Sequence, residues 1–542
     1  MNAMDGAPQY KVRQLTAAME HLEARRWRLA EVQCRVLLTI DRNDVEAMLI
    51  LGLSVAASGE AARAAPILEK VRRARPNHAD PCQDLATMQP RVPRSVVARQ
   101  YRACLRLAPN DAKLRHGFAY YLLENAEADA ALAALRDAPD SPATFNLRGM
   151  ALAELGKYKD AARSFDQAAR LDPSSPGSWA NLGMMLRIEG WFEESTIAYD
   201  KAVARAGNDV QIKVYRAIAL LHAGRWLEGW REYEWRFSRP GHGCLSEAPV
   251  LPTLEPAARL DGTRIIVWHE EGFGDTLQFA RYLPILAALG AAVTAVVPAA
   301  LVRVLRGIPG IAVVQTGDGP LPDHDYQCSF ISLPRVFATL PRDVPGAPYL
   351  AADAALAKVW AARLPRDGLR AGLVWAGQAR PWLQGFTSFD HRRSLALKAF
   401  APLAAVRGAR FVSLQAGTPA AQGQEPPLNM ELTDPMESVH DFADTAAIIA
   451  NLDVVITVDT SVAHLAGAMG KPVFLLDRYD NCWRWQHGRA DTPWYPTMTI
   501  FRQQRPGDWP SVMQRVAASL SAMITFRGIP AQVPISTLAN AA

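Results

Sequence analysis

The chain has 542 residues, of which 49% are apolar and 21% are charged, the ordinary balance of a globular protein. Because one hydrophobic core rarely serves more than about 300 residues, this length predicts several domains. The net charge is only +5 and no dense basic run occurs, which argues against a nucleic-acid-binding protein.

The cysteines and the N-terminal segment favour a cytoplasmic protein. The six cysteines are scattered without a C-x-x-C pair, which argues against a disulfide framework and against a zinc site. The first residues, MNAMDGAPQYKVRQL, lack the apolar core of a signal peptide. The uncharged run from Tyr282 to Val302 is divided by Pro284, Gly290 and Pro298, so we expect a helix, a turn and a short strand there and no membrane span.

Residues 1–240 contain an internal repeat. Small residues and aromatics recur 34 positions apart, as in Gly149, Gly156, Tyr158 and Phe165, followed by Gly183, Gly190, Phe192 and Tyr199. This period, with NLRGMALAELGKYKDAARSFDQAARLDP, resembles the tetratricopeptide repeat, in about seven copies over residues 10–240. Stacked helix pairs form a solenoid with a concave groove, which predicts that the groove binds a protein partner. The alternative is that the repeats serve as a structural spacer or as a dimerisation arm. A homo-oligomeric protein is therefore a second possibility.

After a Pro- and Gly-rich linker at 241–261, short β-branched runs alternate with helical segments. One series (RIIVWH, AAVTAVV, IAVVQ) falls in residues 262–352, and a second (AGLVWAG, ARFVSLQ, LDVVITV, PVFLL) falls in 353–510. This alternation predicts two Rossmann-like lobes with parallel sheets and a ligand cleft between them. Residues 511–542 complete a C-terminal helix and tail, and we expect the helix to brace the lobes.

The first lobe opens with HEEGFGDT directly after its first strand. Gly272 and Gly274 allow a tight turn and the close approach of a ligand to the backbone. Asp275 either caps the next helix or acts as a general base. His269, Glu270 and Glu271 are rival bases. The motif lacks the third glycine of a dinucleotide fingerprint and the lysine of a P-loop, so neither NAD nor ATP binding is expected.

Further polar residues follow the strands of the second lobe. Gly377 and Gln378 come directly after VWA, and Gln415 ends FVSLQ, where it could contact a base or ribose. Arg392 and Arg393 either neutralise a diphosphate leaving group or lie on a solvated surface.

The segment VITVDTSVAHLAGAMGKPVFLL carries the strongest motif. A buried-type strand ends at Asp459, Thr460 and Ser461, and a short helix of small residues follows. A helix N-terminus facing the cleft offers N–H donors to a phosphate. The residues lie on one turn and lack a G-x-S-x-G elbow, which disfavours a hydrolase triad. His464 either packs in the core or donates to a phosphate or sugar.

A further segment, RYDNCWRWQHGRADTPWYP at 478–496, gathers aromatic residues and arginines. Such a group suits stacking on a base or sugar together with pairing to an anion. The equal alternative is packing between the lobes.

The motifs GFGDTLQFARYLP, GLVWAGQ, RRSLAL and DTSVAHLAGAMGKPV together resemble the heptosyltransferase-like glycosyltransferases (family 9) of GT-B fold. The resemblance implies that the Asp-Thr-Ser turn, with His464, meets the phosphates of a nucleotide sugar, and that Asp275 is the base. The repeat-bearing layout is similar to protein glycosyltransferases, including O-linked N-acetylglucosamine transferases and bacterial flagellin glycosyltransferases.

The resemblance predicts transfer of a sugar from a nucleotide-sugar donor to Ser/Thr hydroxyls of a protein held by the repeats, with flagellin as the first acceptor to test. We expect no metal and no cofactor besides the donor, because preorganised groups at the second-lobe turn can stabilise the departing phosphate without a bound metal. Two alternatives stay open: a lipopolysaccharide-type glycosyltransferase, and a catalytically degenerate scaffold that binds a partner.

Overall fold

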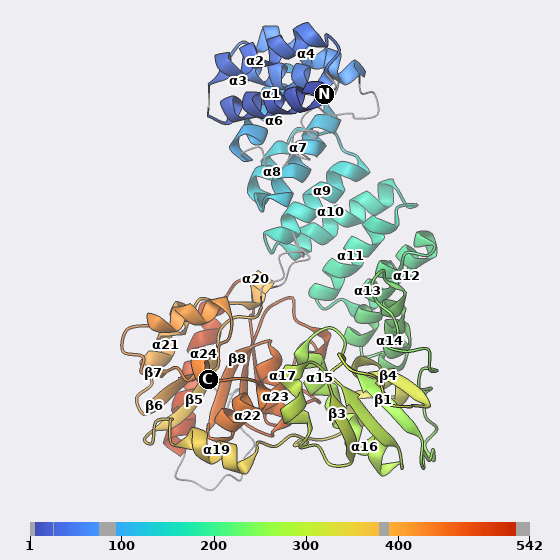
Figure 1. Cartoon of the computed structure of the whole chain (residues 1–542), viewed down its shortest axis with the longest axis vertical. Coiled ribbons are helices and arrows are strands. Elements are labelled where there is room, and N and C mark those ends of the chain that lie inside the picture. Colours follow the sequence, from blue (N-terminus) through green and yellow to red (C-terminus); the bar gives the residue numbers. More distant parts are fainter. Residues whose placement is uncertain (1–5, 25, 75–93, 379–389, 527–542) are drawn as a thin grey trace. The chain divides into compact units, whose positions relative to one another are not determined.

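The structure is a computed structural model that describes residues 6–24, 26–74, 94–378 and 390–526 (Figure 1). The described residues form two compact units, one ending at Ser178 and the other beginning at Trp179. The predicted fold class is confirmed: helical repeats are followed by two α/β lobes with parallel sheets. The domain boundaries of the sequence analysis stay predictions, but the seam between compact units lies well before residue 240.

The first unit consists of paired antiparallel helices. They are α1 (Gly6–Glu23), α2 (Trp27–Ile40), α3 (Val45–Ala57), α4 (Ala61–Ala74), α6 (Arg94–Leu107), α7 (Ala112–Glu124), α8 (Ala128–Ala134), α9 (Pro142–Glu154) and α10 (Tyr158–Leu171). Polar caps start several of them; Ser141 Oγ accepts a hydrogen bond from the backbone N–H of Thr144 at 3.1 Å, at the start of α9.

The repeating glycines are explained by the packing within each helix pair. A Cβ at Gly149 would lie 2.6 Å from a ring carbon of Phe165, and a Cβ at Gly183 would lie 2.8 Å from the ring of Tyr199. Both aromatic rings are buried and fill the space that the missing side chain leaves. The period in the sequence is therefore a period of close helix contacts.

The second unit starts with the last repeats. After α11 (Pro176–Ile188), which contains the seam, come α12 (Phe192–Ala206), α13 (Val210–His222), α14 (Trp226–Tyr233) and the 3-10 turn η1 (Glu234–Ser238). The predicted linker follows as turns and irregular segments, and within it Val250 pairs with Gln327 as an isolated parallel bridge. The helices α13 and α14 share one buried core with both lobes, whereas α11 and α12 contribute to a separate cluster.

The first lobe has a four-stranded parallel sheet of order β3-β2-β1-β4. Its elements are β1 (Arg264–Trp268), α15 (Phe273–Phe279), η2 (Ala280–Tyr282), α16 (Leu283–Ala288), β2 (Ala292–Val296), α17 (Ala299–Leu305), β3 (Ile311–Gln315), β4 (Tyr326–Ser329), η3 (Phe330–Ser332), α18 (Leu333–Val336) and η4 (Pro341–Asp343). The apolar run at 282–302 is a helix, a turn and a strand, as predicted. Within the described ranges, no helix is long and apolar enough to cross a membrane.

The second lobe has a six-stranded parallel sheet of order β10-β9-β8-β5-β6-β7. Its elements are α19 (Ala354–Ala361), β5 (Leu369–Val374), α20 (Asp390–Arg393), η6 (Leu397–Phe400), α21 (Ala401–Ala404), β6 (Ala409–Ser413), η7 (Thr418–Gln424), β7 (Leu432–Thr433), η8 (Met436–Ser438), α22 (Phe442–Ala450), β8 (Val454–Val458), α23 (Ser461–Ala468), β9 (Val473–Asp477), η9 (Trp483–Trp485), β10 (Met498–Arg502) and α24 (Trp509–Phe526). Every residue of β8 and β9 is buried, as expected for central parallel strands.

Three strands of the structure were not expected from the sequence, and the C-terminal helix packs differently from the expectation. The sequence analysis missed β4, β7 and β10, because these runs are short or mix polar with apolar residues. The helix α24 buries Val512, Met513, Val516 and Leu520 in the core of the second lobe. It therefore supports that lobe, and its predicted bracing of both lobes is wrong.

The close contact inside the repeats gives a first prediction. Replacing Gly149 by valine forces side-chain atoms against the Phe165 ring, and overpacking of this kind costs about 1–3 kcal/mol of folding free energy. We expect thermal unfolding of the full chain, followed by circular dichroism, to show an earlier first transition. Gly177→Ala is the matched control, because an added Cβ there meets no atom within 4 Å. Equal stability of the two variants would contradict the packing argument.

Candidate functional site

The glycine turn of the first lobe meets the Asp-Thr-Ser turn of the second lobe. A Cβ at Gly274, in the first turn of α15, would lie 2.8 Å from Cδ2 of His464 and 3.5 Å from the Cα of Ser461. Only a residue without a side chain allows α15 to approach α23 this closely. The two motifs chosen from the sequence, which follow β1 and β8, therefore lie side by side at strand carboxyl ends.

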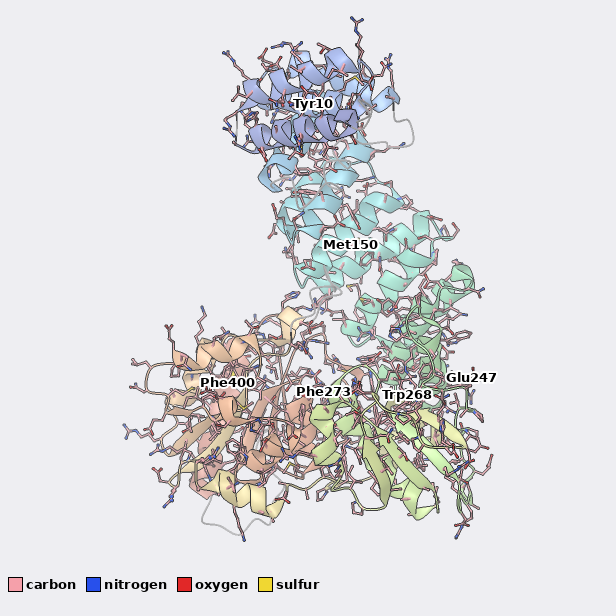
Figure 2. The ribbon with its side chains drawn as sticks, viewed as in Figure 1. Tyr10, Met150, Glu247, Trp268, Phe273 and Phe400 are labelled. Carbon is pink, nitrogen blue, oxygen red and sulfur yellow. The ribbon has the colours of Figure 1, made fainter. Side chains whose placement is uncertain are left out.

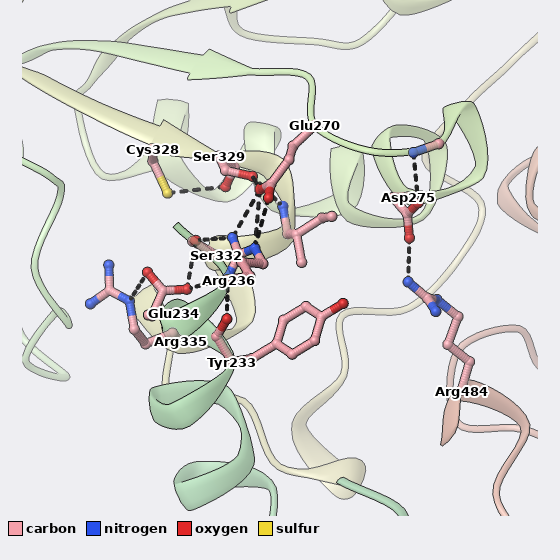
Figure 3. Close-up of polar contacts among 12 residues, drawn as sticks. Tyr233, Glu234, Arg236, Glu270, Asp275, Cys328, Ser329, Ser332, Arg335 and Arg484 are labelled. Carbon is pink, nitrogen blue, oxygen red and sulfur yellow. Dashed lines mark hydrogen bonds and ion pairs between the residues drawn. The ribbon is translucent and has the colours of Figure 1, made fainter. Parts of the chain in front are cut away.

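Asp275 is held by two partners (Figure 3). Its Oδ2 accepts a hydrogen bond from the backbone N–H of Gly272 at 3.0 Å, which caps α15. Its Oδ1 forms an ion pair with the guanidinium of Arg484, a residue of the aromatic segment of the second lobe. Arg484 also donates from Nε to Gln278 Oε1 at 2.7 Å. The carboxylate thus both caps its helix and links the lobes, and its predicted role as base stays a prediction.

The other three candidate bases, His269, Glu270 and Glu271, differ in their surroundings. Glu270 is buried and accepts from Arg236 Nε at 2.9 Å and from Ser329 Oγ at 2.6 Å, so it belongs to a structural network (Figure 3). Nδ1 of His269 bonds Thr276 Oγ1 at 2.7 Å, and burial lowers the pKa of this imidazole. Glu271 is exposed and has a positive φ of 59°, which is uncommon outside glycine. Although the residue has exposed surface, desolvation of its carboxyl, together with the neighbouring charges of Asp275 and Glu270, raises its pKa.

The second-lobe turn leaves the start of α23 without a side-chain cap. Thr460 occupies the N-cap position but makes no side-chain bond to the helix; its hydroxyl instead lies 3.1 Å from Thr457 Oγ1. The first N–H groups of α23 are therefore not taken up by a cap, and the helix dipole favours negative charge at this end.

The two arginines of α20 have different surroundings. Arg393 Nη1 donates to the carbonyl of Asp459 at 3.0 Å, and its Nη2 lies 2.8 Å from Oδ1 of Asp390. The same guanidinium fills the space beside Gly377, where a Cβ would lie 2.6 Å from Nη2. Arg392 instead donates from Nε to Asp480 Oδ2 at 3.0 Å. Arg393 thus joins the ends of β5 and β8, and neither arginine is a solvated surface residue.

Gln378 and Gln415 lie next to this arginine cluster. The carbonyl of Gln378 accepts from Arg393 Nη2 at 3.4 Å, while its side chain is exposed. Gln415 is buried, and its amide bonds backbone groups of Trp375, Ala376 and Ala416 at 2.8 to 3.0 Å. That amide holds the end of β5 in place, so contact with a base or ribose would require it to leave these partners.

His464 is packed inside the protein. Its ring stacks on Trp485 with centroids 5.3 Å apart, and Nδ1 lies 2.9 Å from the hydroxyl of Tyr495. Burial lowers its pKa to about 3, so the imidazole is neutral at physiological pH. The structure therefore agrees with the core alternative for His464, whose contact with a ligand stays a prediction.

The aromatic segment at 478–496 serves packing rather than ligand stacking. Its residues Trp483, Trp485, Trp494 and Tyr495 are each at most 4% exposed. Trp494 stacks on Trp226 of α14 with centroids 5.3 Å apart, and Trp483 meets Trp230 edge to face at 5.0 Å. The alternative of stacking on a base or sugar is therefore wrong for these rings, which instead join the last repeat to both lobes.

The residues that sequence reasoning missed act through long-range pairs. Arg236 is fully buried at the end of the repeats, and Arg484 reaches Asp275 from a distant segment. The sequence did contain a signal for these pairs, an arginine within a run of aromatic residues. Such an arginine is expected to be buried and paired with a carboxylate, but the sequence does not indicate which carboxylate. Within the described ranges, no group of three or more His, Cys, Asp or Glu side chains could hold a metal ion.

Family comparisons match both halves of the chain. Residues 116–176 and 146–210 match the tetratricopeptide repeat, and residues 439–519 match glycosyltransferase family 9 (heptosyltransferase). The second range contains β8, α23 and the aromatic segment described above. The chain is therefore a glycosyltransferase that carries tetratricopeptide repeats.

Among curated proteins, Protein FlbA of Caulobacter vibrioides is 27% identical over 558 residues, covering 93% of this chain and 89% of that protein. A solved glycosyl transferase family 9 structure from Veillonella parvula is 14% identical with a TM-score of 0.35, covering 53% of this chain and 98% of that chain. The O-GlcNAc transferase mutant of Thermobaculum terrenum is 14% identical with a TM-score of 0.27, covering 80% and 96%.

Burial of His464 predicts a pH dependence of stability. The unfolded chain binds a proton at this side chain below about pH 6.5, whereas the folded chain binds it only near pH 3. The unfolded state therefore holds more protons in this window, and the contribution to folding stability falls by about 2 kcal/mol between pH 7 and pH 5.

Denaturant unfolding of His464→Gln at both pH values measures this contribution. We expect the variant to lose less stability on acidification than the wild type by about that amount. Exposed His242 supplies the control, because His242→Gln should leave the difference unchanged. A variant with the wild-type pH dependence would contradict the packed, neutral state of His464.

Proposed function

We propose that this glycosyltransferase moves a sugar from a nucleotide-sugar donor to a Ser/Thr hydroxyl of a protein that the repeats recruit. The observation that carries the proposal is the meeting of the Gly-Asp turn of one lobe with the uncapped start of α23 in the other. This arrangement puts the carboxylates of Glu271 and Asp275 on one side and the first N–H groups of α23 with Arg393 on the other. Displacement at a sugar phosphate needs both a proton acceptor and groups that stabilise the leaving phosphate.

The donor diphosphate is expected at the second lobe. The N–H groups of Thr460 and Ser461 and the dipole of α23 favour negative charge, and Arg393 adds a fixed positive charge at the same strand ends. These groups are held by the fold before the donor arrives, so they stabilise the departing diphosphate without a bound metal. Asp459 contributes through its carbonyl, which fixes the guanidinium.

The acceptor hydroxyl is expected at the first lobe. Asp275 takes its proton as the oxygen attacks the anomeric carbon, the sugar–phosphate bond breaks, and the nucleoside diphosphate leaves with the electron pair. Arg484 keeps the Asp275 carboxylate in one orientation, with Gly272 N–H on the other oxygen. Glu271, next to this group and exposed, is the second candidate for the proton acceptor.

A protein acceptor is supported by the repeats. Tetratricopeptide solenoids present extended concave surfaces, and FlbA resembles this chain across both the repeats and the lobes. A lipid-linked saccharide needs no such surface. Flagellin is the first acceptor to test, on the resemblance to bacterial flagellin glycosyltransferases.

Substitution of the two carboxylates separates their roles. Asp275→Asn keeps the shape of the side chain but removes the proton acceptor, so kcat should fall by roughly 10²–10⁴, with donor binding retained. Glu271→Gln should lower kcat less than about tenfold, since it alters only a neighbouring charge. Sugar transfer is followed with a radiolabelled donor, and donor binding by calorimetry. The reverse order of effects would assign the base to Glu271; no nucleotide binding at all would favour a degenerate scaffold.

Truncation at the seam tests acceptor recruitment. A chain that begins at Pro173 keeps α11 to α24 and should retain donor binding while losing modification of the protein acceptor. Intact-mass spectrometry of flagellin, from strains with the full chain, the truncated chain or neither, reads out a sugar-sized mass. Removal of residues 1–240 is the contrasting variant, because it deletes Trp226, Trp230 and Arg236 and should abolish folding. Full modification by the shorter chain would contradict recruitment by the first unit.

A further inference from the structure

The last aromatic residue of the repeat period differs from those before it. Phe165, Tyr199 and Tyr233 stand 34 positions apart in the sequence. In the first two of these repeats, a glycine on the partner helix leaves the space that the ring fills. The equivalent residue of the last repeat is Ala217, whose Cβ takes up part of that space. The ring of Tyr233 therefore cannot approach its partner helix as closely as the earlier rings do.

Arg236 and the first lobe fix the position of Tyr233 at the end of α14. The carbonyl of Tyr233 accepts from Arg236 Nη1 at 3.1 Å, and the same guanidinium lies over the phenol ring, 5.0 Å from its centroid. The next turn, η1, packs on the carboxyl end of β1: the ring of Phe237 lies 5.8 Å from that of Trp268, which is labelled in Figure 2. The phenol is thus held at the strand end from which the glycine turn continues.

The hydroxyl of Tyr233 points toward the Asp275–Arg484 ion pair (Figure 3). Burial, together with the charges of Glu271 and Asp275, raises the pKa of the phenol, so it keeps its proton at physiological pH. The residue is only 8% exposed, and within the described ranges its hydroxyl makes no hydrogen bond. Because a buried tyrosine hydroxyl normally has a partner, this donor is suited to a ligand that enters beside Asp275.

We propose that Tyr233 binds the polypeptide acceptor by donating a hydrogen bond from its hydroxyl to a peptide carbonyl next to the reacting Ser/Thr hydroxyl. The inference rests on the proposed function, in which Asp275 takes the proton of that hydroxyl. A peptide carbonyl is an acceptor that every Ser or Thr residue brings with it, and a protonated phenol is a donor.

The position of Tyr233 favours the acceptor over the sugar donor as its partner. The groups expected to hold the donor diphosphate, Arg393 and the start of α23, belong to the second lobe, whereas Tyr233 lies with Asp275 at the end of β1. The phenol keeps its proton throughout, so it takes part in binding and not in the proton transfer. The last repeat then supplies one contact of the acceptor site itself.

Replacing Tyr233 by phenylalanine tests this contact, because it removes the hydroxyl and keeps the ring beside Arg236. Initial rates are measured with purified flagellin as acceptor and radiolabelled UDP-, GDP-, ADP- and dTDP-sugars as donors. We expect the KM for flagellin to rise roughly three- to tenfold, the effect of one neutral hydrogen bond, with kcat changed less than about twofold. Slow hydrolysis of the donor should keep its wild-type rate, since water has no peptide carbonyl.

Tyr326→Phe is the matched control. Tyr326 begins β4 and pairs with Ile265, at the end of the sheet opposite to the glycine turn, so the KM for flagellin should not change. Circular dichroism confirms that both variants are folded. An unchanged KM for Tyr233→Phe, with transfer by the wild type, overturns the inference and leaves the proposed function standing. So does an equal loss of donor hydrolysis, which would assign the hydroxyl to the donor or to Asp275. No transfer by the wild type overturns the proposed function, and this inference with it.

Discussion

A buried guanidinium–carboxylate pair holds the end of the repeats against the first strand of the transferase lobes. Arg236 is fully buried, and its donors reach Glu270, Ser332, Glu234 and the carbonyl of Tyr233 at 2.7 to 3.1 Å. Removing such a charge from water costs several kcal/mol, which only complete pairing offsets. The pair therefore tolerates little displacement. Because Glu270 directly precedes the glycine turn, the position of that turn, and with it Asp275, depends on a contact made by the repeats.

The aromatic cluster around Trp226 extends the same constraint to the second lobe. Trp226 and Trp230 of α14 pack against Trp483 and Trp494, whose segment also carries Arg484. A single packed core thus joins the last repeat, the helix that bears the candidate base, and the guanidinium that orients it. Because this packing already holds the side chains of Asp275 and Arg484 in place, no conformational entropy is lost in ordering them when the reaction occurs. The last repeats therefore pack as part of the transferase half, although their sequence is that of tetratricopeptide repeats.

The sequence predicted what local patterns determine. Glycines at a fixed period predicted close helix pairs, and the Asp-Thr-Ser turn after a β-branched run predicted a strand that leads into a helix. It could not predict which partners meet across the fold, because pairing depends on three-dimensional placement. Arg484 lies 209 residues from Asp275, and nothing local distinguishes Trp494 packed on another tryptophan from Trp494 stacked on a base. For the same reason the sequence, which allows Gln415 to contact a base or ribose, could not show that its amide binds the backbone of Trp375 and Ala376.

The seam near Ser178 has an evolutionary consequence. Solenoid repeats contact mainly their neighbours, so duplication or loss of one 34-residue unit before the seam preserves the contacts of Trp226 and Arg236. The length of the solenoid can therefore drift between species while the transferring half stays unchanged. Changes in the first unit are thereby separated from the packing that fixes Asp275 and Arg484.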